Sequence, residues 1–245
     1  LDKALILNPE DAETYNNRGA TKLIIDDYNG SISDFDKAIK LNPNAANFFL
    51  NRGCANYGLE NYKGSVDDLT KALEINPNDD YIYSKRARAR LKLKDFEGTI
   101  QDAKEILEIV MQDEDEEYSE EEFDTLRVAG ECIEEAYSTL AEEKYKIGDH
   151  KGVIDYCSQL IEFSPDNTFA YSMRAVSKDS LGDYKGAIDD YSRVIQIEPN
   201  DSGHYLIRGY SKRESGDRKG AYEDWKKAAE LGNDDASKLL EEFSE

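Results

Sequence analysis

The sequence contains few of the features that mark disulfide-rich, membrane-spanning or nucleic-acid-binding proteins. Its three cysteines, Cys54, Cys132 and Cys157, are odd in number and far apart, which excludes a disulfide framework and a closely spaced metal motif. No apolar run approaches the roughly 18 residues of a membrane-spanning helix, so direct membrane insertion is not expected. Basic side chains are scarce, with 31 Lys and Arg against 53 Asp and Glu and a net charge of −22. Because phosphate contacts need clustered cations, we expect no nucleic-acid partner.

Recognised catalytic motifs are also absent. There is no glycine-rich phosphate loop, no nucleophile elbow and no metalloprotease histidine pair. The two histidines, His150 and His204, take positions that we interpret as structural or surface positions. We therefore expect no enzymatic activity, no catalytic residue, no metal ion and no cofactor.

The five prolines reveal an internal repeat of 34 residues. Pro9, Pro43 and Pro77 are 34 residues apart, as are Pro165 and Pro199, and the gap from Pro77 to Pro165 equals two periods plus 20 residues. Such a fixed period is the sequence signature of a repeat architecture. The predicted organisation is a single array with a second-helix remnant at 1–11, repeats at 12–45, 46–79, 80–113, 134–167, 168–201 and 202–235, an insertion and helix extension at 114–133, and a capping helix at 236–245.

Each repeat reads as two amphipathic helices separated by a polar turn. In the first repeat the residues that carry this pattern are Tyr15, Gly19, Tyr28, Phe35 and Ala38. A helix-turn-helix unit of this length, closed by a proline, resembles the tetratricopeptide repeat (TPR). The resemblance implies an all-α fold, a right-handed superhelical α-solenoid whose first helices line a concave groove.

The beginning of the chain looks truncated. Residues 2–9 match the second helix of a repeat whose first helix is missing, and Leu1 is not a Met. The scattered cysteines favour a reducing compartment, so the cytoplasm is the expected location. A removed leader would leave a periplasmic or secreted location open.

The insertion is strongly acidic. Residues 113–124 hold nine Asp and Glu side chains and no basic one. Ser119 and Glu122 have the spacing of a capping box, which predicts a helix from about residue 120 to 147. The apolar face of this long helix is predicted to contain Phe123, Leu126, Cys132, Ile133, Tyr137 and Leu140.

Five repeats carry an arginine at their seventh position and an aspartate 16 residues later. The fourth repeat lacks both and has Leu140 and Tyr156 in their places. This joint presence and joint absence predicts a structural ion pair between the two helices of each repeat. The predicted pairs are Arg18 with Asp34, Arg52 with Asp68, Arg86 with Asp102, Arg174 with Asp190, and Arg208 with Asp224.

A local cluster of basic residues interrupts the acidic sequence. Residues 83–94 hold six basic side chains and no acidic one, and Lys85, Arg88 and Lys92 share one helix face. The TPR resemblance places this face in the groove, where Asn17 and Asn51 would hold an extended peptide backbone. These five residues form the predicted binding site for an acidic or carboxylate-ended peptide. The alternative interpretation is that the charges are solvated or are offset by the acidic insertion.

The chaperone-tail clamp known in this family requires a Lys and an Asn in one repeat, an Asn in the next, and a Lys and an Arg in the third. At the matching positions this chain has Asn16 and Ala20, keeps Asn51, and has Tyr81 and Lys85. A co-chaperone function is therefore disfavoured.

Two classes of function are consistent with this sequence. The leading one is a non-enzymatic scaffold or adaptor that binds a peptide or partner protein in the concave groove. The alternative is a structural, self-associating array, or an interaction domain of a larger protein, without a peptide ligand in the groove. The sequence does not define the oligomeric state.

Overall fold

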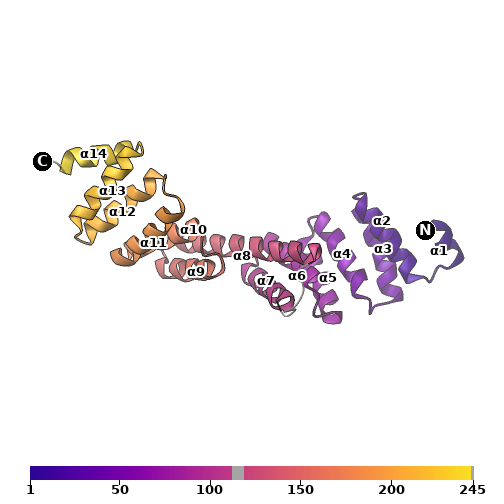
Figure 1. Cartoon of the computed structure of the whole chain (residues 1–245). Helices are drawn as coiled ribbons and strands as arrows, with labels where there is room; N and C mark the ends of the chain where they lie inside the picture. Colours follow the sequence, from indigo (N-terminus) through magenta and orange to yellow (C-terminus); the bar gives the residue numbers. More distant parts are fainter. Residues whose placement is uncertain (112–118, 244–245) are drawn as a thin grey trace. The chain divides into compact units, whose positions relative to one another are not determined.

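The computed structural model describes residues 1–111 and 119–243, and every regular element in these two segments is an α-helix (Figure 1). This confirms the all-α prediction. None of the described helices combines the length and the apolar composition needed to cross a lipid bilayer. The helices are α1 (Asp2–Leu7), α2 (Ala12–Ile24), α3 (Tyr28–Leu41), α4 (Ala46–Gly58), α5 (Tyr62–Ile75), α6 (Asp80–Lys92), α7 (Phe96–Val110), α8 (Glu120–Lys146), α9 (His150–Phe163), α10 (Thr168–Ser180), α11 (Tyr184–Ile197), α12 (Ser202–Glu214), α13 (Arg218–Glu230) and α14 (Asp234–Phe243).

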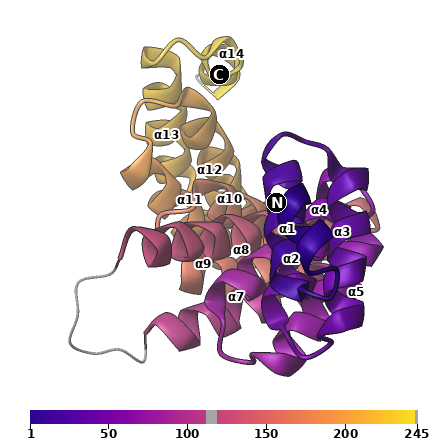
Figure 2. The ribbon, with the colours of Figure 1, turned by 90° about the vertical axis from the view of Figure 1, so that its right-hand side faces the viewer.

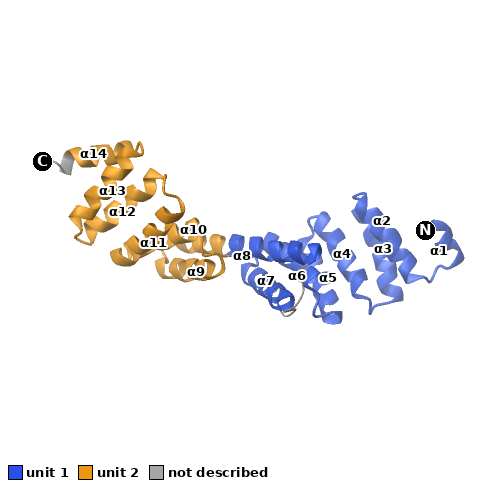
Figure 3. Ribbon diagram, in the orientation of Figure 1, with its two compact units in different colours: residues 1–136 blue, residues 137–245 orange. Residues whose placement is uncertain are grey.

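The chain forms two compact units, residues 1–136 and 137–245, and the long helix α8 contributes to both (Figure 3). In unit 1, α2 packs on α3, α4 on α5, and α6 on α7. In unit 2, α10 packs on α11, α12 on α13, and α14 on α13 (Figure 2). Each helix thus covers the apolar face of its neighbour in sequence, as expected for a repeat that cannot bury its own core alone. A single array over residues 1–245 stays a prediction.

A side-chain cap begins the second helix of each of the six repeats. Asp27 accepts a hydrogen bond from the backbone N–H of Gly30 at 3.0 Å, which satisfies one of the open donors at the start of α3. Glycine is needed here, because a Cβ atom at residue 30 would lie 2.1 Å from the Asp27 carboxylate. The same bond joins Asn61 to Gly64, Asp95 to Gly98, Asp149 to Gly152, Asp183 to Gly186, and Asp217 to Gly220.

The core of a repeat places a small residue of the first helix against a larger one of the second. Phe35 is completely buried, and a Cβ atom on Gly19 would lie 2.6 Å from its ring. Trp225 is buried in the same way against Gly209. The small residues let the paired helices approach closely, which close packing of the core requires. The buried column on the second helices contains Phe35, Leu69, Cys157, Tyr191 and Trp225.

The helix α8 starts with reciprocal capping hydrogen bonds. The Ser119 N–H donates to Glu122 Oε2 at 2.7 Å, and the Glu122 N–H donates to Ser119 Oγ at 3.2 Å. The helix then continues to Lys146, close to the predicted end. Residues 112–118, which include the first acidic residues of the insertion, lie outside the described segments.

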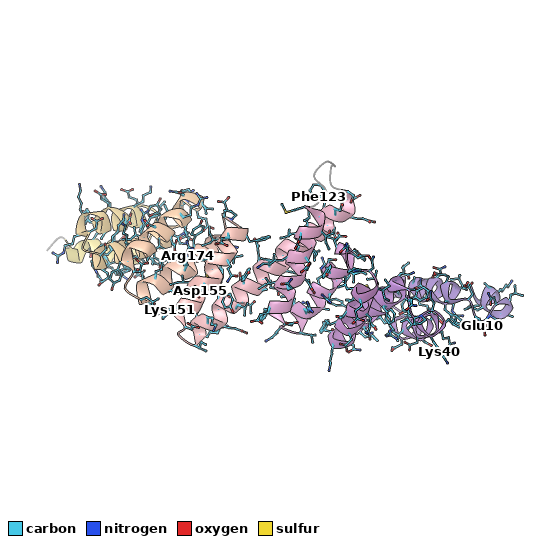
Figure 4. All side chains as sticks on the ribbon, turned by 90° about the horizontal axis from the view of Figure 1, so that it is seen from below. Glu10, Lys40, Phe123, Lys151, Asp155 and Arg174 are labelled. Carbon is cyan, nitrogen blue, oxygen red and sulfur yellow. The ribbon has the colours of Figure 1, made fainter. Side chains whose placement is uncertain are left out.

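The predicted apolar face of α8 is wrong at its first member. Phe123, on the first turn, is 61% exposed (Figure 4). The buried face begins instead at Thr125, whose hydroxyl donates to Asp80 of α6 at 2.6 Å, and continues through Val128. The spacing of apolar residues predicted Phe123 on the buried face. It could not predict that Thr125 would be buried there instead, because a hydrogen bond to another helix cannot be read from apolar spacing.

A partly buried carboxylate joins α10 to α12 in unit 2. Asp179 Oδ2 accepts a hydrogen bond from Ser211 Oγ at 2.7 Å. In the part of the chain that the structure describes, Asp179 Oδ1 is buried without a hydrogen-bond partner. Burial raises the pKa of Asp179, although the hydrogen bond from Ser211 and the nearby Tyr191 hydroxyl act in the opposite direction.

Replacing Asp179 by asparagine is expected to raise the Tm at pH 7. A carboxyl group whose pKa is raised on folding contributes stability that is complete below its unfolded pKa and is lost as the pH rises through the folded pKa. The amide keeps an oxygen for Ser211 and removes the buried charge. Circular dichroism melts at several pH values should show a Tm difference that shrinks toward pH 3, whereas the exposed replacement Asp189→Asn should change little at any pH. A pH-independent difference for Asp179→Asn would contradict this explanation.

Candidate functional site

The structure brings together all five predicted arginine and aspartate pairs. In the first repeat, Arg18 Nε donates to Asp34 Oδ2 at 2.8 Å, and Arg18 Nη2 donates to Asp34 Oδ1 at 2.6 Å. The aspartate is buried and the guanidinium is partly exposed. Two parallel bonds of this kind match the planar guanidinium to the carboxylate. The same two bonds, at 2.5–3.0 Å, join Arg52 to Asp68, Arg86 to Asp102, Arg174 to Asp190, and Arg208 to Asp224.

Each of these aspartates has a second donor, which the sequence analysis did not identify. It lies one helical turn after the arginine, as for Lys22, whose Nζ is 2.7 Å from Asp34. Burial raises the pKa of Asp34, but the hydrogen bonds from Arg18 and Lys22 outweigh this effect and hold the pKa below its usual value. The corresponding donors in the other repeats are Asn56, Arg90, Lys178 and Lys212.

The arginines also connect each repeat to the preceding second helix. Arg52 Nη1 donates to Asp36 of α3 at 2.6 Å, and Arg208 Nη1 donates to Ser192 of α11 at 2.9 Å. The aromatic ring three residues earlier supports the guanidinium, as Tyr15 does for Arg18 at 5.6 Å. Figure 4 labels Arg174, whose Nη1 bonds in the same way to a serine of α9. All three guanidinium nitrogens are used within the scaffold, so this column is structural.

A cavity of about 420 Å³ opens in unit 1 between the first three complete repeats. Its apolar walls include Leu23 from α2 and Leu50 and Tyr57 from α4, and its polar side includes Lys85 and Arg88 from α6. The volume lies in the range of ligand pockets and is large enough for one or two amino-acid side chains.

Lys85 and Arg88 supply the positive charge of this cavity. Two other arginines of the same helix, Arg86 and Arg90, are paired with the buried Asp102. Among the described residues, neither Lys85 nor Arg88 forms an ion pair, and Lys85 Nζ lies 4.3 Å from the centre of the Tyr81 ring. Two cations without a carboxylate partner, next to an apolar wall, can bind an anionic group.

Two further polar groups of the cavity are held by hydrogen bonds. One is the carboxylate of Asp26, which accepts from the Tyr28 hydroxyl at 2.6 Å, and the other is the amide of Asn51. Asn51 Nδ2 donates to Asn16 Oδ1 at 2.9 Å, which orients the Asn51 amide from the preceding repeat. Burial raises the pKa of the Cys54 thiol, although the charge of Lys85 opposes this. A neutral thiol is a poor nucleophile, so burial makes the Cys54 side chain unreactive.

The structure gathers three of the five predicted peptide-binding residues around the cavity, namely Asn51, Lys85 and Arg88. The other two, Asn17 and Lys92, are exposed and are not part of its lining. Sequence reasoning missed residues of the second helices, such as Tyr28 at the start of α3, because the groove rule of the family considers first helices alone. The only available signal was that Tyr28 occupies the turn position that is aromatic in several repeats.

Acidic side chains at the start of α8 face the same helix. Glu120, Glu121 and Asp124 line a shallow depression together with Tyr81. The hydrogen bond from Arg127 lowers the pKa of Asp124, and the charges of Arg88 and Lys85 add to this effect. The described part of the acidic insertion therefore lies within the electric field of the two cavity cations.

Comparisons with known proteins were made for sequence and for structure. The family model for the tetratricopeptide repeat matches residues 12–45, 46–79 and 170–201. No curated protein matches the chain in sequence. Similar solved structures include a tetratricopeptide repeat protein from Parabacteroides merdae ATCC 43184, with 19% identity, coverage of 96% of this chain and 84% of that chain, and a TM-score of 0.45.

Two further similar structures are described with a peptide-binding site or a bound partner. YrrB, a TPR protein with an unusual peptide-binding site, has 17% identity, coverage of 95% and 92%, and a TM-score of 0.36. The TPR2AB domain of yeast Sti1, in a complex with pHSP90, has 19% identity, coverage of 94% and 96%, and a TM-score of 0.40. Three segments of this chain match the family model, and the same kind of helix pair recurs along the described residues, so the chain contains tetratricopeptide repeats.

Proposed function

We propose that unit 1 is a non-enzymatic interaction module that binds the carboxylate end of a peptide or partner protein. Members of the family generally act as scaffolds for protein interactions. The observation that supports this proposal best is the cavity in which Lys85 and Arg88, both without a carboxylate partner among the described residues, stand beside an apolar wall.

The chemistry of the cavity indicates which peptide ends would bind. Leu23, Leu50 and Tyr57 offer an apolar surface for one side chain, and the two cations offer charge-assisted hydrogen bonds to a carboxylate. A peptide that ends in an apolar residue satisfies both, because its terminal carboxylate and its last side chain leave the same Cα atom. The Asn51 side chain forms a hydrogen bond to the backbone of the peptide. Asn17 and Lys92, which lie outside the cavity, contact peptide residues that precede the C-terminal one.

Charge reversal tests this proposal. Peptides ending in a Leu or Val carboxylate should bind the chain at least about tenfold more weakly after Lys85→Glu and Arg88→Glu, because each charge-assisted bond contributes about 1.5–3 kcal/mol. The same peptides with an amidated C-terminus should bind the original chain weakly. Fluorescence anisotropy at 50 and 300 mM salt measures both effects, and the higher salt should reduce the difference.

A matched control reverses the same number of charges at two positions away from the cavity. Lys40→Glu and Lys104→Glu change two exposed lysines of second helices and give the same net charge as the cavity variant (Figure 4 labels Lys40). This control should bind like the original chain. Equal loss in both double variants would mean that overall charge, and not the cavity, governs binding.

Self-association is the second candidate function, and one observation favours it. Ile6 and Leu7 of α1 are 80% and 86% exposed, and Ile24 at the end of α2 is 83% exposed. Apolar residues exposed to this degree are candidate contact points for another copy of the chain. Light scattering should then report a mass that falls toward that of the monomer after Ile6→Glu and Leu7→Glu. A monomeric mass for the original chain would reject self-association and would leave the peptide proposal intact.

A further inference from the structure

The connection between α11 and α12 brings three metal-ligand side chains together. Glu198, Asp201 and His204 are spaced three residues apart, and each offers one ligand atom within 4.8 Å of the other two. The closest such approach given by the structure is 3.9 Å, between His204 Nδ1 and Glu198 Oε2. Donor atoms around a tetrahedral zinc ion lie about 3.4 Å apart, so small side-chain rotations would complete the geometry.

His204 is the residue that packing does not explain. The third position holds a buried apolar residue in the second to fifth repeats, namely Phe48, Ile82, Ala136 and Ala170, whereas the first repeat has the partly buried Thr14. In the last repeat this position holds an imidazole whose Nδ1 is buried and has no hydrogen-bond partner among the described residues. A buried polar atom without a partner destabilises a fold, and a metal ion shared with the two nearby carboxylates would satisfy this imidazole nitrogen.

Both carboxylates are already held by a donor on one of their oxygens. Thr168 Oγ1 donates to Glu198 Oε1 at 2.8 Å, which leaves Glu198 Oε2 facing His204. The Gly203 N–H donates to Asp201 Oδ1 at 2.8 Å. Hydrogen bonds of this kind orient metal ligands before the ion arrives.

The cap of α12 also differs from the caps of comparable helices. Asp79 and Asn167, which begin α6 and α10, each accept the N–H of the third residue after them. Asp201 instead accepts the N–H of Gly203, the second residue after it. The first helices α2 and α4 have no side-chain cap hydrogen bond, so the caps of first helices vary, and in α12 the cap bond holds the carboxylate of a candidate ligand.

We propose that Glu198, Asp201 and His204 bind a first-row divalent metal ion, for which zinc is the best representative. One imidazole nitrogen and two carboxylate oxygens suit zinc and its neighbours, whereas calcium and magnesium prefer all-oxygen sites. The ion can enter from solvent, because the Glu198 side chain is 45% exposed and Asp201 is exposed. The bound ion links the end of α11 to the first turn of α12.

Zinc binding to the full chain tests this proposal. Isothermal titration with zinc chloride should show one site per chain, and the ion should raise the Tm because it binds the folded protein. His204→Phe copies the residue of the second repeat and keeps an apolar group in the core. It should weaken zinc binding at least about tenfold and abolish the Tm increase. Thr168→Val, which removes only the orienting hydrogen bond, should weaken binding by about tenfold.

Two control variants separate this site from other possible ligands. His150→Tyr changes the other histidine to the residue found at that position in three repeats, and Cys54→Ala removes the accessible thiol. Both should bind zinc like the original chain. The proposal fails if His204→Phe keeps the same affinity and stoichiometry, or if the original chain shows no Tm increase at millimolar zinc. Neither outcome bears on the peptide cavity of unit 1.

Discussion

Replacing Arg52 by leucine is expected to lower the free energy of unfolding by about 3–5 kcal/mol, and replacing Asp68 by leucine is expected to lower it by less, because Arg52 is partly exposed and keeps Asp36 as a partner. The first change leaves the buried Asp68 carboxylate with only the neutral Asn56 as a donor, and the second removes the two bonds that Arg52 makes to Asp68. Asp68 is 8% exposed in its side chain and accepts two bonds from Arg52, at 2.9 and 2.5 Å. Arg52 also bonds to Asp36 of the preceding repeat, so its loss affects two repeats. Urea unfolding of the full chain, followed by circular dichroism, measures both effects.

The double replacement should be much less harmful than either single one. Two leucines of similar total volume remove the buried carboxylate and its partly exposed guanidinium partner at once, and apolar replacements of whole buried pairs are often close to neutral. The fourth repeat of this chain is an internal precedent, because it holds Leu140 and Tyr156 at the same two positions. The second repeat suits this test best, since the further donor to its aspartate is the neutral Asn56 and no second cation is stranded. Additive losses in the double variant would show that the two side chains are not coupled.

The period of the sequence was sufficient to predict the helix pairs and the arginine and aspartate contacts. Both depend on spacing along the chain, and spacing is visible in a single sequence. The second donors to the aspartates were missed, although Lys22, Arg90, Lys178 and Lys212 recur one turn after the arginines. The second repeat has the neutral Asn56 at this position. In the sequence, a position that is basic in most repeats but not in all of them looks like any variable surface position.

Other features depend on contacts between helices that no repeat period encodes. Thr125 is buried because it bonds to Asp80, which is 45 residues away. The cavity of unit 1 contains Tyr28, because the second helix of one repeat approaches the first helix of the next. From the sequence, His204 was interpreted as a structural or surface residue, because a single histidine near a helix start is usually structural. Its buried, unpartnered nitrogen becomes visible only when the surrounding side chains are placed.

Replacing Gly209 by alanine is expected to lower the free energy of unfolding by about 1–3 kcal/mol, the usual cost of adding an atom to a packed core. The higher helix propensity of alanine would by itself stabilise α12 by up to about 1 kcal/mol. The sign of the change in the free energy of unfolding therefore depends on how the new Cβ atom packs. The new Cβ atom would lie 2.3 Å from Trp225 Nε1. The indole cannot easily move away, because Trp225 Nε1 donates to the Leu206 carbonyl at 3.2 Å and its ring meets Tyr210 edge to face.

The fifth repeat supplies the compensating change for this collision. There Ala175 of α10 faces Tyr191 of α11, and both residues are buried. Adding Trp225→Tyr to Gly209→Ala copies that pair into the last repeat, so the double variant should be more stable than Gly209→Ala alone. Trp225→Tyr by itself should be destabilising, because it leaves space beside a glycine. If the stability losses of Gly209→Ala and Trp225→Tyr simply added in the double variant, the contact between residues 209 and 225 would not determine which side-chain sizes are tolerated there. The pairing of small with large core residues along the repeats would then need another explanation.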